Sequence, residues 1–433
     1  DWCNVPFSES FTNVMPAWLQ LKYAHANGLL SDDIFAVANI LKVMSLHRVS
    51  DIYGPLPVLH FGETENPYNS QEECYMHFFE TLDSAIAVLK DVVENNPDAK
   101  PLEEVDALYH GNYSKWLKLA NSVKLRLAMR ICYVKPDLAK QYAMEAVRDG
   151  VMETADDSAL FQSWGSITII NPLEKIWNGY SDTRMGASMD SYLNGYNDPR
   201  LPVYFQPVTE GDNKGEYRGV ANGMPNPQQD DYKAMSAPNV QEKSTDSPLR
   251  WMMASEVAFL RAEGAMRGWT AEMGGTAEEF YNKGIELSFL ENGLSADAAA
   301  RYAADETSKP TDFTDVSTAN TKYNISALGK ITIKWNAGAS EEEQLERIIT
   351  QKWIAMFPNG TEAWSEFRRT GYPLIFPVRS NYPTSGVDTN KQIRRMVFPQ
   401  SEYSNNGAAV QEAVKLLGGP DNGGTKLWWD KKN

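Results

Sequence analysis

The chain has 433 residues, a formal net charge of −16 and a pI near 4.9. This length exceeds the size at which single hydrophobic cores usually stop growing, so two lobes or one extended helical array is expected. A strongly acidic chain repels phosphate backbones, and no Lys/Arg stripe follows any predicted helix. The charge therefore argues against nucleic acid, anionic membranes and uniformly anionic polymers. The adjacent pair Arg394-Arg395 could still meet a single carboxylate or sulfate, or it could lie in a solvated loop.

The three cysteines, Cys3, Cys74 and Cys132, are odd in number and widely spaced. This pattern predicts buried thiols rather than a disulfide framework or a CxxC metal site. The sequence holds no uncharged apolar run of about 18 residues, so no transmembrane helix is predicted. Because the sequence starts at Asp1 without a signal peptide, we expect a processed or trimmed product whose export signal or lipid-anchor cysteine lies upstream.

Helical periodicity dominates the first half of the chain. Apolar residues recur there at a spacing of 3.6 residues, and polar or proline signals mark the starts. Four helices are expected to begin at Asp32-Asp33, at Ser70 with a capping box to Glu73, near Trp116, and at Pro136, the last ending at Gly150.

The second half repeats the pattern. A helix is expected from Met252 to about Gly268, and Thr276 with Glu279 forms a capping box for the next one. A further helix spans Leu345 to Phe357, and a short one spans Ala363 to Phe367.

These helices form about four helix-turn-helix pairs, which predicts an all-α, TPR-like array. Gly-, Pro-, Asn- and Asp-rich insertions separate the pairs, and such long connections are uncommon unless they are functional or disordered. We expect one domain over 1–433, with its helical scaffold mainly at 30–150, 250–292 and 341–370. A large irregular, loop-rich lobe is expected mainly at 50–69, 151–249, 296–340 and 371–433, because its aromatic content is too high for disorder.

Catalytic signatures are mostly absent. The sequence contains no GxxxxGK[ST], GxSxG, HExxH or paired CxxC, and the five histidines show no ligand spacing. Paired carboxylates for glycoside hydrolysis cannot be judged from sequence, since their separation is spatial. No cofactor or metal is expected; Asp230-Asp231 could hold calcium but read more readily as a solvated turn.

Aromatic residues in polar loops are the remaining chemical feature. A Trp or Tyr ring can stack on the apolar face of a sugar while Asn or Asp takes its hydroxyls. Packing within the irregular lobe is the alternative role for each ring. The candidate ligand-binding residues are Tyr68, Asn69, Trp164, Trp177, Asn178, Tyr180 and Asp182.

The segment Ile348 to Pro373, IITQKWIAMFPNGTEAWSEFRRTGYP, is more specific than its amphipathic pattern requires. It resembles the C-terminal signature of the SusD/RagB family of outer-membrane nutrient-binding lipoproteins of Bacteroidetes. Other segments fall in the family's order, and the resemblance covers nearly the whole chain. The other matching segments are Asp51-Ile-Tyr-Gly54-Pro-Leu-Pro57, the helix Ala120 to Arg130, Asp198-Pro-Arg200-Leu201 and the helix from Ser255-Glu256 to Gly268.

The motif residues are expected to act as scaffold. Trp364, Glu366, Arg368 and Arg369 should tie the last helix pair to earlier helices through charge-assisted bonds and ring packing. Site residues vary within the resembled family and cannot be carried over by motif.

The resemblance implies a non-enzymatic, surface-exposed receptor that is lipid-anchored in the outer membrane. It would bind an oligo- or polysaccharide and deliver it to a SusC-type TonB-dependent transporter. Three alternatives stay open at this stage: a peptide receptor of the same fold, a glycoside hydrolase, and a TPR adaptor that binds no small ligand.

Overall fold

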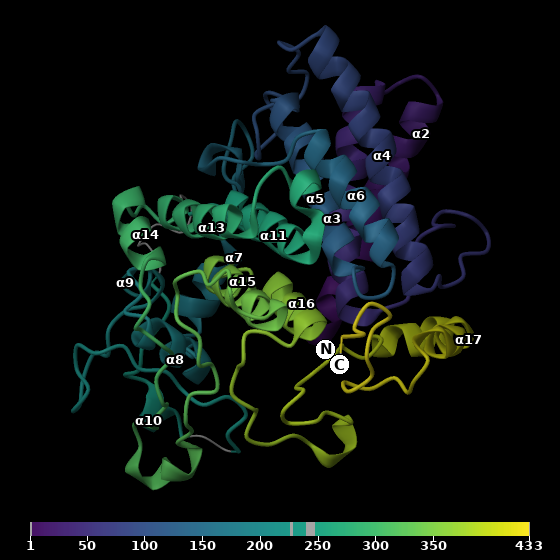
Figure 1. Ribbon diagram of the computed structural model, residues 1–433. Coiled ribbons are helices and arrows are strands. Elements are labelled where there is room, and N and C mark those ends of the chain that lie inside the picture. Colours follow the sequence, from purple (N-terminus) through teal and green to yellow (C-terminus); the bar gives the residue numbers. More distant parts are fainter. Residues whose placement is uncertain (1, 226–227, 240–246, 433) are drawn as a thin grey trace. The chain divides into compact units, whose positions relative to one another are not determined.

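The computed structural model describes residues 2–225, 228–239 and 247–432. Within them the chain forms two compact units, one from residues 1–152 and 382–433 and the other from residues 153–381. The described residues are mainly helical, which confirms the all-α prediction with a TPR-like arrangement (Figure 1).

The first unit is built on four successive helices. Each packs against the next in sequence, as α3 does on α4, α4 on α5 and α5 on α6. The four are α3 (Asp32–Tyr53), α4 (Gln71–Asn95), α5 (Tyr113–Arg130) and α6 (Pro136–Arg148). The predicted capping box of α4 is present, because the Ser70 hydroxyl accepts from the Glu73 N–H and the Glu73 carboxylate accepts from the Ser70 N–H.

Two helical parts of the first unit were not predicted. The first is near the start of the chain, where α1 (Val5–Glu9) and α2 (Met15–Ala26) precede α3. The second is α17 (Gln400–Leu417), which lies in a segment expected to be irregular. Its apolar stripe is weak, since its buried residues are Val410 and Ala413, and Asn406 has non-helical φ/ψ angles.

Asp51 of the Asp-x-Tyr-Gly motif is at the centre of the first unit's buried polar network. Its Oδ1 accepts from the Tyr75 hydroxyl at 2.5 Å and from the Trp429 indole N–H at 2.8 Å, and Arg130 lies 3.4 Å from Oδ2. Asp51 and its three partners are all nearly fully buried. The motif therefore joins the early helices to the last residues of the chain.

The second unit combines helix pairs with irregular chain. Its longer helices are α8 (Ala187–Gly195), α11 (Ala254–Gly264), α13 (Ala277–Glu291), α14 (Ala296–Ala303), α15 (Glu341–Ala355) and α16 (Gly360–Thr370). Helix α11 packs on α13 and α15, and α15 packs on α16. The predicted capping box from Thr276 to Glu279 opens α13.

Short elements make up the rest of the second unit. Strands β1 (Ala159–Phe161) and β2 (Leu249–Met252) pair antiparallel, with Phe161 opposite Leu249. The brief helices are α7 (Pro172–Glu174), α9 (Leu201–Tyr204), α10 (Gln229–Tyr232) and α12 (Thr270–Met273).

Arg369 is the main electrostatic link between α16 and α11. Its guanidinium donates to both oxygens of Glu263 on α11, at 2.7 and 2.6 Å, and to Glu366 on its own helix at 2.9 and 2.6 Å. Lys352 on α15 lies 3.0 Å from Glu366. All four side chains are buried. The positive charge of Arg369 holds the pKa of Glu263 below its usual range, although burial alone would raise it. The predicted scaffold role of Arg369 and Glu366 is confirmed.

A second buried cluster fixes the irregular segment that contains the Asp-Pro-Arg-Leu motif. Arg200 is fully enclosed and donates to Asp198 at 2.9 and 2.7 Å, to Ser288 on α13 at 2.9 Å and to Gln351 on α15 at 3.0 Å. The Tyr302 hydroxyl of α14 donates to the same Asp198 at 2.8 Å. Three helices thus meet one loop at a single guanidinium.

We predict that Arg369→Met lowers the free energy of unfolding by about 3–5 kcal/mol, because Glu263 and Glu366 would lose their bidentate partner while staying buried. Urea denaturation followed by circular dichroism measures the change. As a control, Lys283→Met removes an exposed pair with Glu286 and should change stability by less than about 0.5 kcal/mol. A similar effect of both variants would contradict the assigned role of Arg369.

Candidate functional site

Trp164 is presented by a tight turn of the second unit just after β1. The backbone N–H groups of Trp164 and Ile167 donate to each other's carbonyl oxygens at 3.0 and 2.9 Å, and Gly165 takes a φ of +56° inside the turn. The Ile169 N–H donates to the Ser163 hydroxyl at 2.9 Å. Trp164 is 37% exposed in this turn. These local bonds define the turn that carries the Trp164 ring.

The next aromatic residues follow α7. Asn171 caps this short helix by accepting from the Leu173 N–H at 3.0 Å, and a π-type turn continues through Lys175–Gly179. Trp177 is half-buried and stacks on Phe357, with centroids 5.9 Å apart and planes 10° from parallel. Tyr180 is 48% exposed, and Asn178 is exposed beside it. This segment thus supplies the Trp177 ring, which packs against Phe357, and the Tyr180 ring, which is exposed to solvent.

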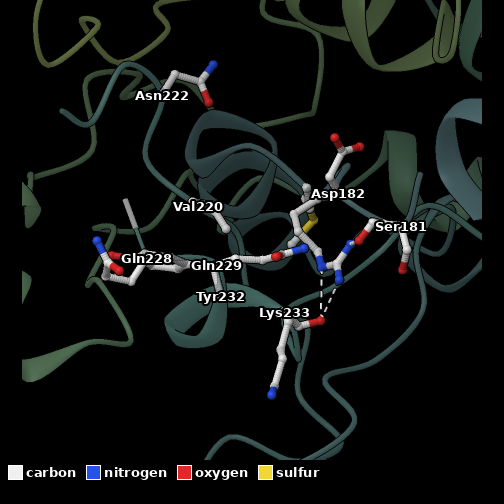
Figure 2. A pocket seen from close by; sticks show the side chains of 10 residues that line it. Ser181, Asp182, Val220, Asn222, Gln228, Gln229, Tyr232 and Lys233 are labelled. Atoms are coloured by element: carbon white, nitrogen blue, oxygen red, sulfur yellow. Dashed lines mark hydrogen bonds between the residues drawn. The ribbon is translucent and has the colours of Figure 1, made fainter. Parts of the chain in front are cut away.

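A pocket of about 520 Å³ lies directly after these aromatics in the chain (Figure 2). Its volume falls within the range of about 300–1,000 Å³ typical of small-molecule sites. Its buried lining residues are Met185 and Tyr232, whereas Asp182, Asn222 and Gln229 are exposed. The remaining lining residues are Ser181, Arg184, Val220, Gln228 and Lys233.

The pocket is amphipathic, with apolar side chains and primary amides around one cavity. Figure 2 shows Gln229 reaching across toward the side of Ser181 and Asp182, whereas Lys233 points away. Such an arrangement offers both donors and acceptors to a polar ligand and an apolar surface to its carbon skeleton.

Arg184 holds two walls of the pocket together. Its Nε and Nη2 donate to the Lys233 carbonyl at 3.1 and 2.5 Å (Figure 2). Its Nη1 donates to the carbonyls of Ser181 at 3.2 Å and Thr183 at 2.8 Å. Ser181 has a φ of +53°, a conformation that costs a non-glycine residue about 1–2 kcal/mol. Burial lowers the pKa of the Arg184 guanidinium below its usual value. We infer that the hydrogen bonds from Arg184 to these carbonyls offset both the backbone strain at Ser181 and the cost of burying the guanidinium.

Tyr68 and Asn69, two of the seven predicted contact residues, belong to the first unit and are enclosed there. The Tyr68 hydroxyl donates to Glu402 at 2.8 Å, its ring packs edge-on against Phe398, and burial raises its pKa. The Asn69 side-chain oxygen accepts from the N–H groups of Val58 and Leu59 at 3.1 and 3.0 Å. Each is 6–7% exposed and is held by the fold, so we leave both out of the binding surface proposed below.

The other five candidates lie together in sequence, at residues 164–182 of the second unit, and Asp182 lines the pocket. The amides Asn222, Gln228 and Gln229 were missed. Their only sequence signal was a Gln-Gln pair in a Gly- and Pro-rich loop, which carries no periodicity or motif.

Asp230 and Asp231, considered for calcium, lie in the first turn of α10, and Asp230 pairs with Lys233 at 3.1 Å. Across the described ranges, no group of three or more His, Cys, Asp or Glu side chains is placed to hold a metal ion. The same ranges contain no helix that is both long and apolar enough to cross a lipid bilayer.

A family model described as "SusD-like: Susd and RagB outer membrane lipoprotein" matches residues 1–430. The chain therefore belongs to the SusD/RagB family, as its motifs predicted, and members of this family are binding proteins.

Solved structures agree with this assignment. A chitin-binding SusD homologue from Flavobacterium johnsoniae is 41% identical, with a TM-score of 0.91 over 99% of this chain and 86% of that one. A SusD homologue from Bacteroides uniformis ATCC 8492 is 40% identical, with a TM-score of 0.90 over 100% of this chain and 88% of that one. A structure described as a chitin-binding protein is 28% identical, with a TM-score of 0.76 over 99% and 88% of the two chains. Among curated proteins, none matches the chain.

We predict that Arg184→Ala loosens the pocket wall without unfolding the unit. Losing hydrogen bonds from a charged donor costs about 1.5–3 kcal/mol, so protection of the Met185 amide, which donates to the Ser236 carbonyl at 2.8 Å, should fall by roughly tenfold or more. Hydrogen exchange read by mass spectrometry checks this. Protection of α13 should stay unchanged, and equal loss in α13 would mean that Arg184 supports the whole unit instead.

Proposed function

We propose that this protein is a cell-surface glycan receptor that binds an oligo- or polysaccharide through residues 164–182 of its second unit. The observation that carries the proposal is the set of aromatic rings held on loops of that unit, Trp164, Trp177 and Tyr180. They occur in a chain of a nutrient-binding family, and Tyr180 directly precedes Ser181, which lines a pocket with an amide rim.

The chemistry of sugars fits this surface. A pyranose ring has an apolar face of C–H groups and a belt of hydroxyls, so an aromatic plane and nearby amide or carboxylate groups recognise different parts of it. Tyr180 and Trp164 supply exposed rings, and Phe357 fixes the plane of Trp177. Asn178 and Asp182, both exposed, would take hydroxyl groups.

Relatives suggest which glycan to test first. Two of the similar solved structures are described as chitin-binding, one of them 41% identical to this chain. Chitin is uncharged, and an uncharged polymer avoids the repulsion that a net charge of −16 would impose on an acidic glycan. Chitin oligosaccharides are therefore the first ligand to offer.

We also propose a cellular location and a partner protein for this receptor. The family is described as outer-membrane lipoproteins, which supports a lipid-anchored protein on the outer face of that membrane. Such a receptor would pass its glycan to a SusC-type TonB-dependent transporter, the partner that the family assignment supports.

We predict that alanine at Trp164, Trp177 or Tyr180 weakens binding of chitin oligosaccharides. Loss of a stacked ring costs on the order of 1–3 kcal/mol, or about 5- to 150-fold in affinity. Isothermal titration calorimetry measures the single variants, and affinity electrophoresis on soluble chitin derivatives measures the triple variant.

Tyr382→Ala is the matched control, because Tyr382 is 85% exposed and belongs to the first unit. It should bind as the unchanged protein does. Undiminished binding by the triple variant would reject the proposed surface. If other glycans bind and chitin does not, the choice of sugar is wrong but the receptor role stands; if only peptides bind, the receptor takes a different cargo.

A further inference from the structure

The sequence suggested Arg394 and Arg395 as a binding site for one anion. In the structure, both guanidinium groups are engaged by other groups of the chain. Arg394 donates to Asp430 at 2.8 and 2.6 Å, and Arg395 donates to the Tyr53 carbonyl at 3.1 and 2.9 Å and also to Asp421. Both arginines are buried, so the solvated-loop alternative is wrong as well. Both guanidinium groups therefore stabilise the first unit through these contacts.

Two lysines near this pair surround a cavity of the first unit. The cavity has a volume of about 190 Å³ and lies between the Gly54-Pro55 turn, the start of α4, the end of α17 and the C-terminal segment. Its lining residues are Gly54, Pro55, Gln71, Leu416, Leu417, Lys426, Leu427, Trp428 and Lys431. The lining residues include two lysines and no Asp or Glu.

The ammonium groups lack partners of their own. In the described part of the chain, neither Lys426 nor Lys431 makes a side-chain hydrogen bond or an ion pair within 4 Å. Lys426 is half-buried, and its burial lowers the pKa of its ammonium group. Asp430 opposes that shift, whereas the positive charges of Arg394, Lys391 and Lys431 add to it. A partly desolvated charge among like charges is costly, and a bound anion would offset that cost.

The cavity is held in shape by contacts that do not involve the lysines. Gln71 donates to the Ser50 carbonyl at 2.9 Å and accepts from the Trp428 N–H at 3.0 Å, which ties the C-terminal segment to α4. Gly54 has a φ of +94°, and a Cβ on it would lie 2.8 Å from the Leu417 side chain. Glycine is therefore needed for Leu417 to close this wall.

We propose that this cavity binds a small oxyanion group, such as a carboxylate, sulfate or phosphate, between the ammonium groups of Lys426 and Lys431. Lysine acts as a rotatable point charge, so the site would accept several oxyanion geometries. The volume suits one charged group rather than a polymer. This site is independent of the glycan surface proposed for the second unit.

The expected affinity is modest. The last residues of α17, Leu416 and Leu417, line the cavity, and the negative end of the helix dipole offsets part of the positive potential. Partly exposed charges are also screened within about 10 Å at 0.1 M salt. A dissociation constant on the order of 1 mM is expected, weakening as salt rises.

The test titrates the whole chain with sodium sulfate, inorganic phosphate and sodium glucuronate at one fixed ionic strength, using calorimetry. The unchanged protein should give saturable binding with at least one probe. Lys426→Met/Lys431→Met should lower that affinity at least tenfold. Lys90→Met/Lys214→Met makes the same charge change at exposed positions outside the cavity lining and should bind normally.

Comparison of the probes identifies the source of the oxyanion, because tighter binding of glucuronate indicates a sugar acid and tighter binding of sulfate or phosphate a free ion. Absence of saturable binding for all three, or unchanged affinity in the lysine double variant, would overturn the proposal. Should the double variant melt early, Lys431→Met alone, at an exposed position, must still lower the affinity at least threefold. Trp164→Ala should leave oxyanion binding intact, which separates this site from the glycan surface.

Discussion

A single buried guanidinium fixes the irregular chain of the second unit to its helices. Arg200 meets Asp198 of its own loop, Ser288 of α13 and Gln351 of α15, and it has no exposed surface. A charge so deeply enclosed costs several kcal/mol unless its donors are satisfied, so the loop has one favourable way to dock. The pocket of Figure 2 is lined by residues on both sides of this loop in sequence, from Ser181 to Met185 before it and from 220–222 and 228–233 after it.

Helices could be predicted because their signals are local. Capping boxes at Ser70 and Thr276 and the apolar stripes that follow them identify α4 and α13, and both helices begin where expected. Helix α17 was missed because Asn405, Asn406 and Gly407 interrupt its sequence pattern, and the φ/ψ angles at Asn406 are non-helical. Its place in the first unit is set by contacts such as Glu402 with Tyr68, which lie 334 residues apart and leave no trace in a local pattern.

The same limit applies to the binding surface. Tyr68 and Tyr180 have similar neighbours in sequence, with Pro, Asn, Gly, Ser or Asp on either side, yet one is buried and the other is open to solvent. Composition therefore predicted that aromatic rings are presented on loops but could not say which ones. The pocket amides Asn222, Gln228 and Gln229 are distant in sequence from the other wall of the pocket, Ser181 to Met185, and only the folded chain brings the two together, so no spacing rule identifies them.

The turn that carries Trp164 is closed by hydrogen bonds within residues 163–169. The buried Arg200 and Arg369 clusters are made by other residues of the unit. Substitutions in the Trp164 turn should therefore change the stability of the fold little, while they change which ligand groups the ring can contact. A lineage that meets a new nutrient could then retune its receptor one loop at a time, keeping the helical frame and whatever docks against it unaltered.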